Sequence, residues 1–201
     1  MDTQQPRLDP AQHDGTHRSR GAGRHLLERW PSLVGLLALL LNVANGADAH
    51  VTAMIIVIAS ACYLATSAIG PRRSGWIVVG GAIVAVVLAR VTGLDATVTA
   101  LVLGVTSAVL GLLRGADVDR RELVIQALGF LGFSAVALTA MTVGPVPALY
   151  LAALAAVGHA AWDVVHFVRD RVVPRSLAEA CFVLDLGLGL AMLFLAAVMP
   201  M

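Results

Sequence analysis

Three residues towards the end of one apolar segment have the types and the spacing to do chemistry together. His159, Asp163 and His166 are separated by four and then three positions, so in a helix all three lie on one face. A fourth polar residue, Asp185, lies in the apolar segment that follows. Imidazole and carboxylate groups are ligands for Zn, Fe and Mn, and the same groups can pass protons. The sequence therefore predicts a candidate metal or proton site at these four residues.

The composition of the chain indicates that the segments around these residues lie in a membrane. Of 201 residues, 58% are hydrophobic and 13% are charged, and the mean hydropathy is +0.83. A soluble domain carries about 45–50% apolar and about 25% charged residues. Lipid must therefore solvate part of this apolar surface, and we predict a polytopic integral membrane protein.

Seven apolar runs follow a polar N-terminal segment. They span about residues 31–46, 51–69, 76–93, 97–113, 122–143, 148–168 and 177–198. Most have the roughly 17–25 residues that a helix needs to cross the hydrocarbon core, and helices satisfy their own backbone hydrogen bonds in lipid. We predict an all-α bundle of seven transmembrane helices in one domain, residues 30–201, preceded by a disordered cytoplasmic tail, residues 1–29.

The placement of arginine predicts the orientation of the bundle. All 14 basic residues are arginines, and 13 of them lie in the tail or in the second, fourth and sixth loops. Because basic residues collect on the cytoplasmic side, we predict the N-terminus in the cytoplasm and the C-terminus outside. A basic content made only of arginine, with abundant Ala, Val, Leu and Gly, is typical of a GC-rich bacterial genome. We therefore expect a multi-pass protein of the bacterial inner (plasma) membrane.

The first apolar run also has features of a signal peptide. An arginine-rich flank precedes Leu33–Leu41, and Ala47-Asp48-Ala49 could be a cleavage site. The long polar region ahead of this run, and a second run that starts at Val51, favour retention of the first span. The sequence leaves both interpretations open.

Depth along the last two predicted helices places the four candidate residues in the cytoplasmic half of the bundle. Counting inward from the loop between these helices, His159, Asp163 and His166 lie about 15, 9 and 5 Å deep, and Asp185 about 13 Å deep. Because the loop is short, the two helices are expected to be antiparallel neighbours. An ionised carboxylate in hydrocarbon costs at least a few kcal/mol, and two close carboxylates repel unless a cation or a proton lies between them.

A structural role for these residues remains an alternative. The histidines and aspartates could form a hydrogen-bond ladder that fixes helix packing, and His166 is close enough to the surface to be interfacial. Two further polar residues have a simpler interpretation: the sequence Ser176-Leu-Ala-Glu179 is typical of a capping box, in which both side chains satisfy backbone donors at a helix start. Ser176 and Glu179 are therefore assigned to structural capping.

Several classes of function are excluded or disfavoured by what the sequence lacks. A seven-helix retinal protein needs a lysine for its Schiff base, and the chain has none. A haem b site with two histidine ligands needs them on facing helices, whereas both histidines here lie on one. The basic tail fits attraction to anionic lipid headgroups, so we expect membrane lipids as partners and no nucleic acid; protein partners stay unknown.

The topology and the intramembrane helix with His159-x-x-x-Asp163-x-x-His166 are similar to the seven-span hydrolases that include adiponectin receptors and alkaline ceramidases. The resemblance implies a metal-dependent hydrolase in the membrane. Those proteins carry an H-x-x-x-H pair on their last helix and a further His and Asp on earlier helices. Here the motif lies on the sixth predicted helix, and the second and third lack His and Asp, so the chain is not assigned to that family.

Three kinds of function therefore stay open from the sequence. The first is a metal-dependent membrane enzyme, with Zn, Fe or Mn as cofactor and a lipid-soluble substrate. The second is a proton- or cation-coupled transporter, and the third is a non-catalytic membrane subunit or sensor. Whether the chain is an enzyme, which substrate or ion it handles, and its oligomeric state are not determined by the sequence.

Overall fold

The computed structural model describes residues 29–199 of the chain, so that the predicted tail lies almost entirely outside the described residues. Within this range all regular elements are helical: α2 (Trp30–Ala44), α3 (Ala49–Ile69), α4 (Gly75–Val91), α5 (Ala96–Leu113), α6 (Arg120–Ala140), α7 (Pro145–Arg169) and α8 (Arg175–Val198), with short 3-10 turns at Arg72–Ser74 and Gly115–Asp117. Each apolar run in the sequence coincides with one helix. The largest displacement of a helix end is three residues, as for the run 148–168 against Pro145–Arg169.

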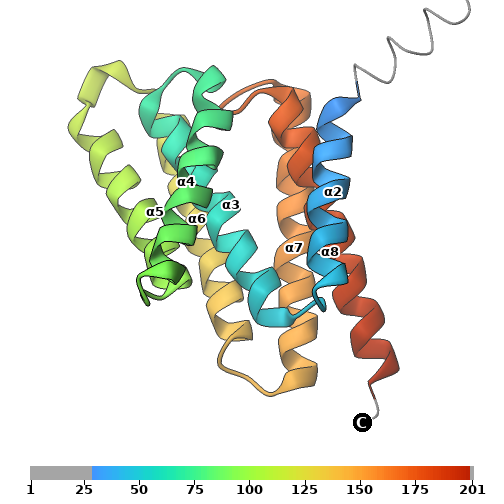
Figure 1. Cartoon of the computed structure of the whole chain (residues 1–201). Coiled ribbons are helices and arrows are strands. Elements are labelled where there is room, and N and C mark those ends of the chain that lie inside the picture. The colour runs from blue at the N-terminus through green and yellow to red at the C-terminus, as the bar shows by residue number, and fades with distance from the viewer. Residues whose placement is uncertain (1–28, 200–201) are drawn as a thin grey trace, which may run out of the picture.

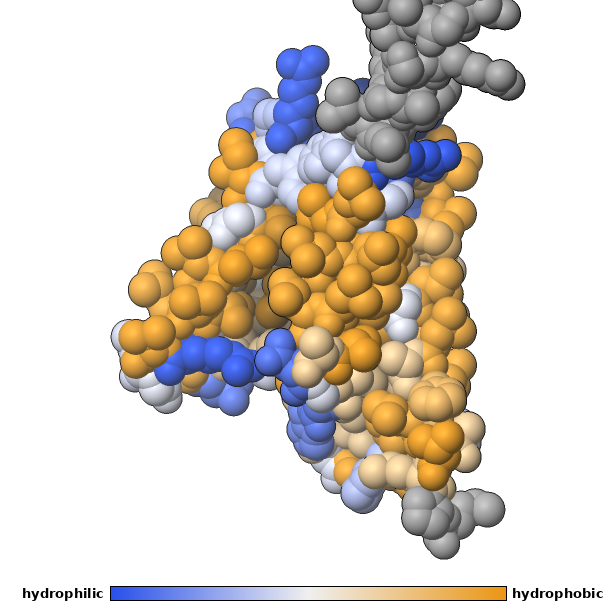
Figure 2. Space-filling view, turned by 45° about the vertical axis from the view of Figure 1, so that its right-hand side comes forward, coloured by the Kyte–Doolittle hydropathy of each residue, from blue (hydrophilic) through white to orange (hydrophobic). Residues whose placement is uncertain are grey.

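Six of these helices are long and apolar enough to cross a membrane, and α2 is a shorter apolar helix of 15 residues. Their outer faces carry large apolar side chains that are widely exposed, such as Ile77 at 77%, Val91 at 79% and Leu113 at 78%. Figure 2 shows these faces as a broad hydrophobic band with hydrophilic residues at both ends. Exposed apolar area on this scale is characteristic of contact with lipid, and the chain is a multi-pass bundle of the membrane-protein type.

The helix ends follow from local sequence. Asp48, Asp95 and Asp119 each precede a helix, and each carboxylate accepts hydrogen bonds from backbone N–H groups of the first turn, which are otherwise unpaired. Pro145 occupies the first position of α7, where a missing N–H costs nothing. Gly70 ends α3 with a φ of 98°, a conformation that residues with a side chain rarely adopt.

Helix α3 lies in the middle of the bundle and contacts α4, α5, α6, α7 and α8. The antiparallel pair α7 and α8 packs on one side of α3, and α2 packs on α8; α4 and α5 lie on the other side (Figure 1). Successive helices alternate in direction, so the loops fall into two groups. The loops after α3, α5 and α7 lie at the end of the bundle where α2 begins, and the other three lie at the distal end (Figure 1).

We call the end of the bundle that holds the start of α2 and the loops after α3, α5 and α7 the arginine-rich end. It carries nine of the ten arginines among the described residues: Arg29, Arg72, Arg73, Arg114, Arg120, Arg121, Arg169, Arg171 and Arg175. The exception is Arg90, in the last turn of α4 at the distal end, where its guanidinium contacts the sulfur of Met54 at 3.6 Å.

Helix α2 is held against α8 by two glycines. A Cβ at Gly35 would collide with the backbone of Ala180, and a Cβ at Gly187 would collide with the side chain of Leu39. Small residues of this kind let helix backbones approach closely in a membrane. The close approach brings the start of α2 over the arginine-rich end of α8, which matters for the site described below.

Candidate functional site

Three of the four residues singled out in the sequence form one buried cluster. His159 and Asp163 lie on α7 and Asp185 lies on α8, and each is at most 1% exposed. One potential ligand atom from each residue lies within 4.8 Å of the others. The cluster exists because the i and i+4 positions of α7 share a face and because α8 returns antiparallel beside it.

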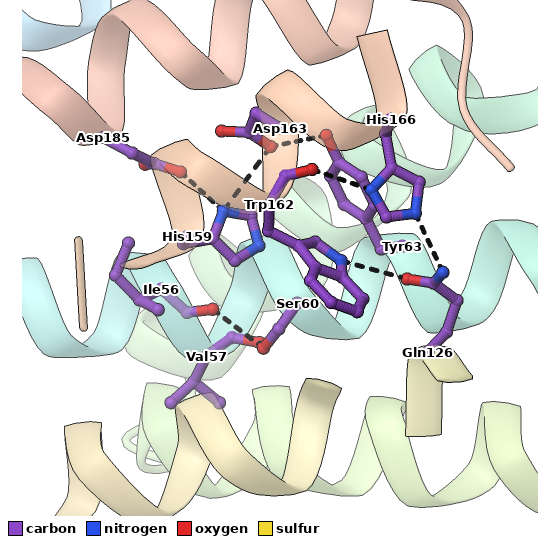
Figure 3. A network of polar contacts seen from close by, with 10 residues as sticks. All are labelled: Ile56, Val57, Ser60, Tyr63, Gln126, His159, Trp162, Asp163, His166 and Asp185. Carbon is purple, nitrogen blue, oxygen red and sulfur yellow. Dashed lines mark hydrogen bonds and ion pairs between the residues drawn. The ribbon is translucent and has the colours of Figure 1, made fainter. Parts of the chain in front are cut away.

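The imidazole of His159 lies between the two carboxylates (Figure 3). Its Nδ1 is 2.7 Å from Oδ2 of Asp185 and 3.6 Å from Oδ1 of Asp163. The ring of Phe133 packs edge-on against the imidazole, with centroids 5.0 Å apart, and Tyr63 does the same from another side at 5.4 Å. These aromatic contacts limit the orientations that the ring of His159 can adopt.

Tyr63 on α3 is a member of the site that the sequence analysis missed. Its hydroxyl donates a hydrogen bond to Oδ1 of Asp163 at 2.5 Å, and the side chain is 1% exposed. The tyrosine lies 100 positions before its partner, in a run with no other sign of chemistry. The only available signal was that a buried tyrosine hydroxyl usually has a hydrogen-bond partner.

Each member of the cluster keeps one buried polar atom without a partner among the described residues: Nε2 of His159, Oδ2 of Asp163 and Oδ1 of Asp185. Buried polar atoms are nearly always paired, so three exceptions in one place need an explanation. The charges of the cluster also need an explanation, because two carboxylates face one imidazole, which carries at most one positive charge. A proton or a bound cation must balance the cluster.

The donor set fits a divalent metal ion. One imidazole and two carboxylates are ligands that Zn, Fe and Mn accept, and one candidate ligand atom of each residue lies within 4.8 Å of the others. A metal ion with three protein ligands keeps a coordination position for water or substrate. Protonation of a carboxylate would balance the charge equally well.

His166 lies outside this cluster, in a separate hydrogen-bonded ring with Gln126 and Trp162 (Figure 3). The indole Nε1 of Trp162 donates to Oε1 of Gln126 at 3.3 Å. The amide nitrogen of Gln126 therefore donates to Nε2 of His166 at 2.9 Å, and Nδ1 of His166 donates to the backbone carbonyl of Trp162 at 2.9 Å. Both ring nitrogens are engaged in hydrogen bonds outside the cluster, so the structure does not bring His166 together with the other three residues.

The capping box expected at Ser176 and Glu179 is not formed. Helix α8 begins at Arg175 with Pro174 at its N-cap position and no side-chain cap hydrogen bond. The helix starts two residues earlier than a cap at Ser176 requires, since proline fixes a backbone conformation suited to helix entry. The hydroxyl of Ser176 instead accepts from the indole of Trp76 at 3.0 Å.

Glu179 contacts the start of α2. Its carboxylate accepts a hydrogen bond from the hydroxyl of Ser32, and the guanidinium of Arg29 lies 3.5 Å away. A partly buried carboxylate is stabilised by such partners. Glu179 therefore joins α8 to α2 near the arginine-rich end.

A third buried carboxylate, Glu122 at the start of α6, was not predicted as a site residue. It is 6% exposed and pairs with Arg169 at 2.8 Å and Arg171 at 3.3 Å. Its position ties α6 to the end of α7 and the loop that follows, and it closes the bundle above His166.

Comparison with known proteins gives no relative from which to assign the site. No protein-family model matches the chain, and searches of curated proteins and of solved structures give no significant match.

Proposed function

We propose that the chain is a seven-span protein of a bacterial plasma membrane, with the arginine-rich end in the cytoplasm. The clustering of nine arginines at one end of the bundle supports this orientation, because cytoplasmic ends are enriched in basic residues. Helix α2 is the seventh span in this proposal. Its 15 residues cover only about 22 Å at 1.5 Å per residue, which a local thinning of the bilayer can accommodate.

Cysteine labelling tests this orientation. Arg73→Cys lies in the loop at the arginine-rich end and Leu94→Cys lies at the distal end. In a background with Cys62→Ala and Cys181→Ala, a membrane-impermeant maleimide should label the thiol at position 94 in intact bacterial cells. The thiol at position 73 should react only after lysis. Labelling in the reverse order would overturn the proposed orientation.

We further propose that the protein is a metal-dependent membrane enzyme acting on a lipid-soluble substrate. The observation that carries this proposal is the cluster of His159, Asp163 and Asp185, in which each residue keeps one unpartnered buried atom. These three residues would hold the metal. A divalent metal bound by three protein ligands supplies a polarised water molecule as nucleophile or acts as a Lewis acid on a carbonyl or phosphoryl oxygen.

The residues around the ligands have separate roles in this proposal. Tyr63 holds one oxygen of Asp163, which leaves the other oxygen to the metal. The aromatic rings of Phe133 and Tyr63 exclude water from the far side of His159, since a dry site strengthens electrostatic interactions inside it.

Transport of a proton or cation is the less favoured function. It requires a polar route across the whole bundle, and the buried cluster lies in the half nearer the arginine-rich end. Towards the distal end, the buried polar side chains of the described residues are the hydroxyls of Thr52 and Ser134, and the buried residues around them are apolar, among them Ala49, Ala53, Ala148, Leu149, Ala152, Met192 and Ala196. The buried acidic and histidine side chains of the described residues therefore lie on one side of the bundle only, which suits an enzyme open to one leaflet.

Metal content of the detergent-purified protein tests the proposed function. We expect one Zn, Fe or Mn per chain in the wild type and none in a folded His159→Ala/Asp163→Ala variant. His50→Ala is the matched control, because His50 is exposed at the distal end of the bundle and should leave the metal in place. A folded wild-type protein that binds none of these metals, even after dialysis against each, would overturn the proposal.

A further inference from the structure

A small cavity lies between α7 and α8 and reaches the buried cluster. It has a volume of about 200 Å³ and is lined by Arg29, Asp163, Val164, Phe167, Ala178, Glu179 and Phe182. Asp163 is the cluster member in its wall. Figure 3 shows that one carboxylate oxygen of Asp163 faces Tyr63 while the other points away from it. The second oxygen is the one without a partner.

The side walls of the cavity continue onto the surface that faces lipid. Val164 is 45% exposed and Phe167 is 39% exposed, on the outer face of α7. Ala178 is fully buried and lies on the α8 side. A molecule dissolved in the bilayer could therefore reach the cavity sideways, between α7 and α8, without passing through water.

The cavity lies next to an excess of positive charge at the arginine-rich end. The guanidinium of Arg29 is 3.5 Å from Glu179, and 73% of the Arg29 side chain is exposed. Arg175 lies over the ring of Phe167 at 5.9 Å, and it shares the carboxylate of Asp170 with Arg72, at 3.7 and 2.8 Å. Asp163 adds a carboxylate to the cavity wall. The end of the bundle as a whole carries nine guanidiniums against five carboxylates among the described residues, those of Asp117, Asp119, Glu122, Asp170 and Glu179, a balance that favours an anionic group at the rim.

We propose that this cavity binds a single-chain anionic amphiphile taken laterally from the leaflet at the arginine-rich end, and that this class includes the substrate of the proposed enzyme. The headgroup, a phosphate or a carboxylate, pairs with Arg29 at the rim, and the chain lies along Val164 and Phe167. Asp163 is four residues deeper than Phe167, or about 6 Å along the helix. An ester or amide bond about 6 Å below the headgroup would therefore face the cluster, where addition of water would release an acid and an alcohol or amine.

The volume limits the size of the molecule. A space of about 200 Å³ holds about seven groups of the size of a water molecule at roughly 30 Å³ each. This admits the neck of a single-chain lipid between α7 and α8. The substrate class rests on the proposed enzyme function, whereas binding of the amphiphile can be tested without it.

Photo-crosslinking in liposomes tests the cavity. The purified protein is reconstituted in phosphatidylcholine vesicles with a long-chain alkyl phosphate or a fatty acid, each carrying a diazirine in its chain. We expect crosslinks between residues 164 and 182 that a saturating excess of unlabelled anionic amphiphile abolishes. An alkyltrimethylammonium salt of equal chain length should not compete. Comparing the two probes shows which headgroup binds more tightly.

Two matched pairs of variants locate the binding. Val164→Trp fills the cavity wall, whereas Val165→Trp adds the same bulk at a neighbouring position that is equally exposed, at 43% against 45%. Only Val164→Trp should abolish the labelling that the unlabelled anionic amphiphile displaces. Arg29→Gln should weaken competition by the anionic amphiphile about fivefold, and Arg73→Gln, at the same end of the bundle, should leave it unchanged.

The outcomes separate this proposal from the enzyme function. Metal in the wild type together with labelling that no anionic amphiphile displaces would overturn the cavity proposal and leave the metal site standing. Displaceable labelling without any metal would overturn the enzyme and support the binding site. The competition with wild-type protein decides the question even if Val164→Trp does not fold.

Discussion

The hydroxyl of Tyr63 on α3 donates a hydrogen bond of 2.5 Å to Asp163 on α7. This contact joins the central helix of the bundle to the cluster of His159, Asp163 and Asp185, and it holds one of the two oxygens of Asp163. Because a carboxylate ligand needs its free oxygen aimed at the metal, Tyr63 is a positioning residue in the proposed site.

Tyr63→Phe should therefore weaken metal binding while the protein stays folded. Loss of a partner that orients a ligand typically lowers metal affinity about 10- to 100-fold, and we expect an effect in this range. The measurement is a competitive titration with a metal-binding dye in detergent. Tyr150→Phe is the control, because Tyr150 is 52% exposed on the outer face of α7. Equal affinities for the two variants would show that Tyr63 does not position the site.

Removing the metal should destabilise the wild-type protein, because two carboxylates would then face each other without a cation between them. Treatment with a strong chelator is expected to lower the thermal midpoint of unfolding. Binding at 100 times the dissociation constant corresponds to about 2.7 kcal/mol. In Asp185→Asn one of the two charges is gone, so the same chelator should produce a much smaller shift. A shift of the same size in both proteins would count against a metal shared by these residues.

His166→Ala should destabilise the fold without removing the metal. The substitution leaves the amide nitrogen of Gln126 without its partner, and an unpaired buried polar group costs about 1–3 kcal/mol. We expect a lower thermal midpoint and an unchanged metal content in the folded fraction. Loss of the metal in a folded His166→Ala protein would place this histidine in the site after all.

Gly35→Val should detach α2 from α8. A side chain at position 35 collides with the backbone of Ala180, whereas a side chain at Gly80 meets open space. Overpacking a close contact costs about 1–3 kcal/mol, so Gly35→Val should lower the thermal midpoint and Gly80→Val should not. If the first span were removed as a signal peptide, both variants of the mature protein would behave like the wild type.

The helices and part of the site could be predicted from the sequence because they depend on local properties. The length of an apolar run and the turn residues between runs determine where a helix can begin and end in lipid, as Asp95 and Pro145 illustrate. The spacing of His159 and Asp163 by one helical turn requires only that the segment is helical. The depth of Asp185 in the membrane could be predicted by counting residues along the following helix, which was expected to run antiparallel to the helix of His159 and Asp163.

Tertiary packing decided the remainder, because it depends on how each helix is rotated about its axis and on which helix lies beside it. Nothing in the sequence around Tyr63 indicates that α3 turns this residue towards Asp163. His166 shares a helical face with His159 by spacing, yet Gln126 of α6 engages it in a separate ring. Glu179 has the sequence signature of a cap, but α2 packs closely against α8, and the carboxylate of Glu179 accepts a hydrogen bond from Ser32 instead. A periodic pattern determines which residues share a face, and only the three-dimensional arrangement determines what that face meets.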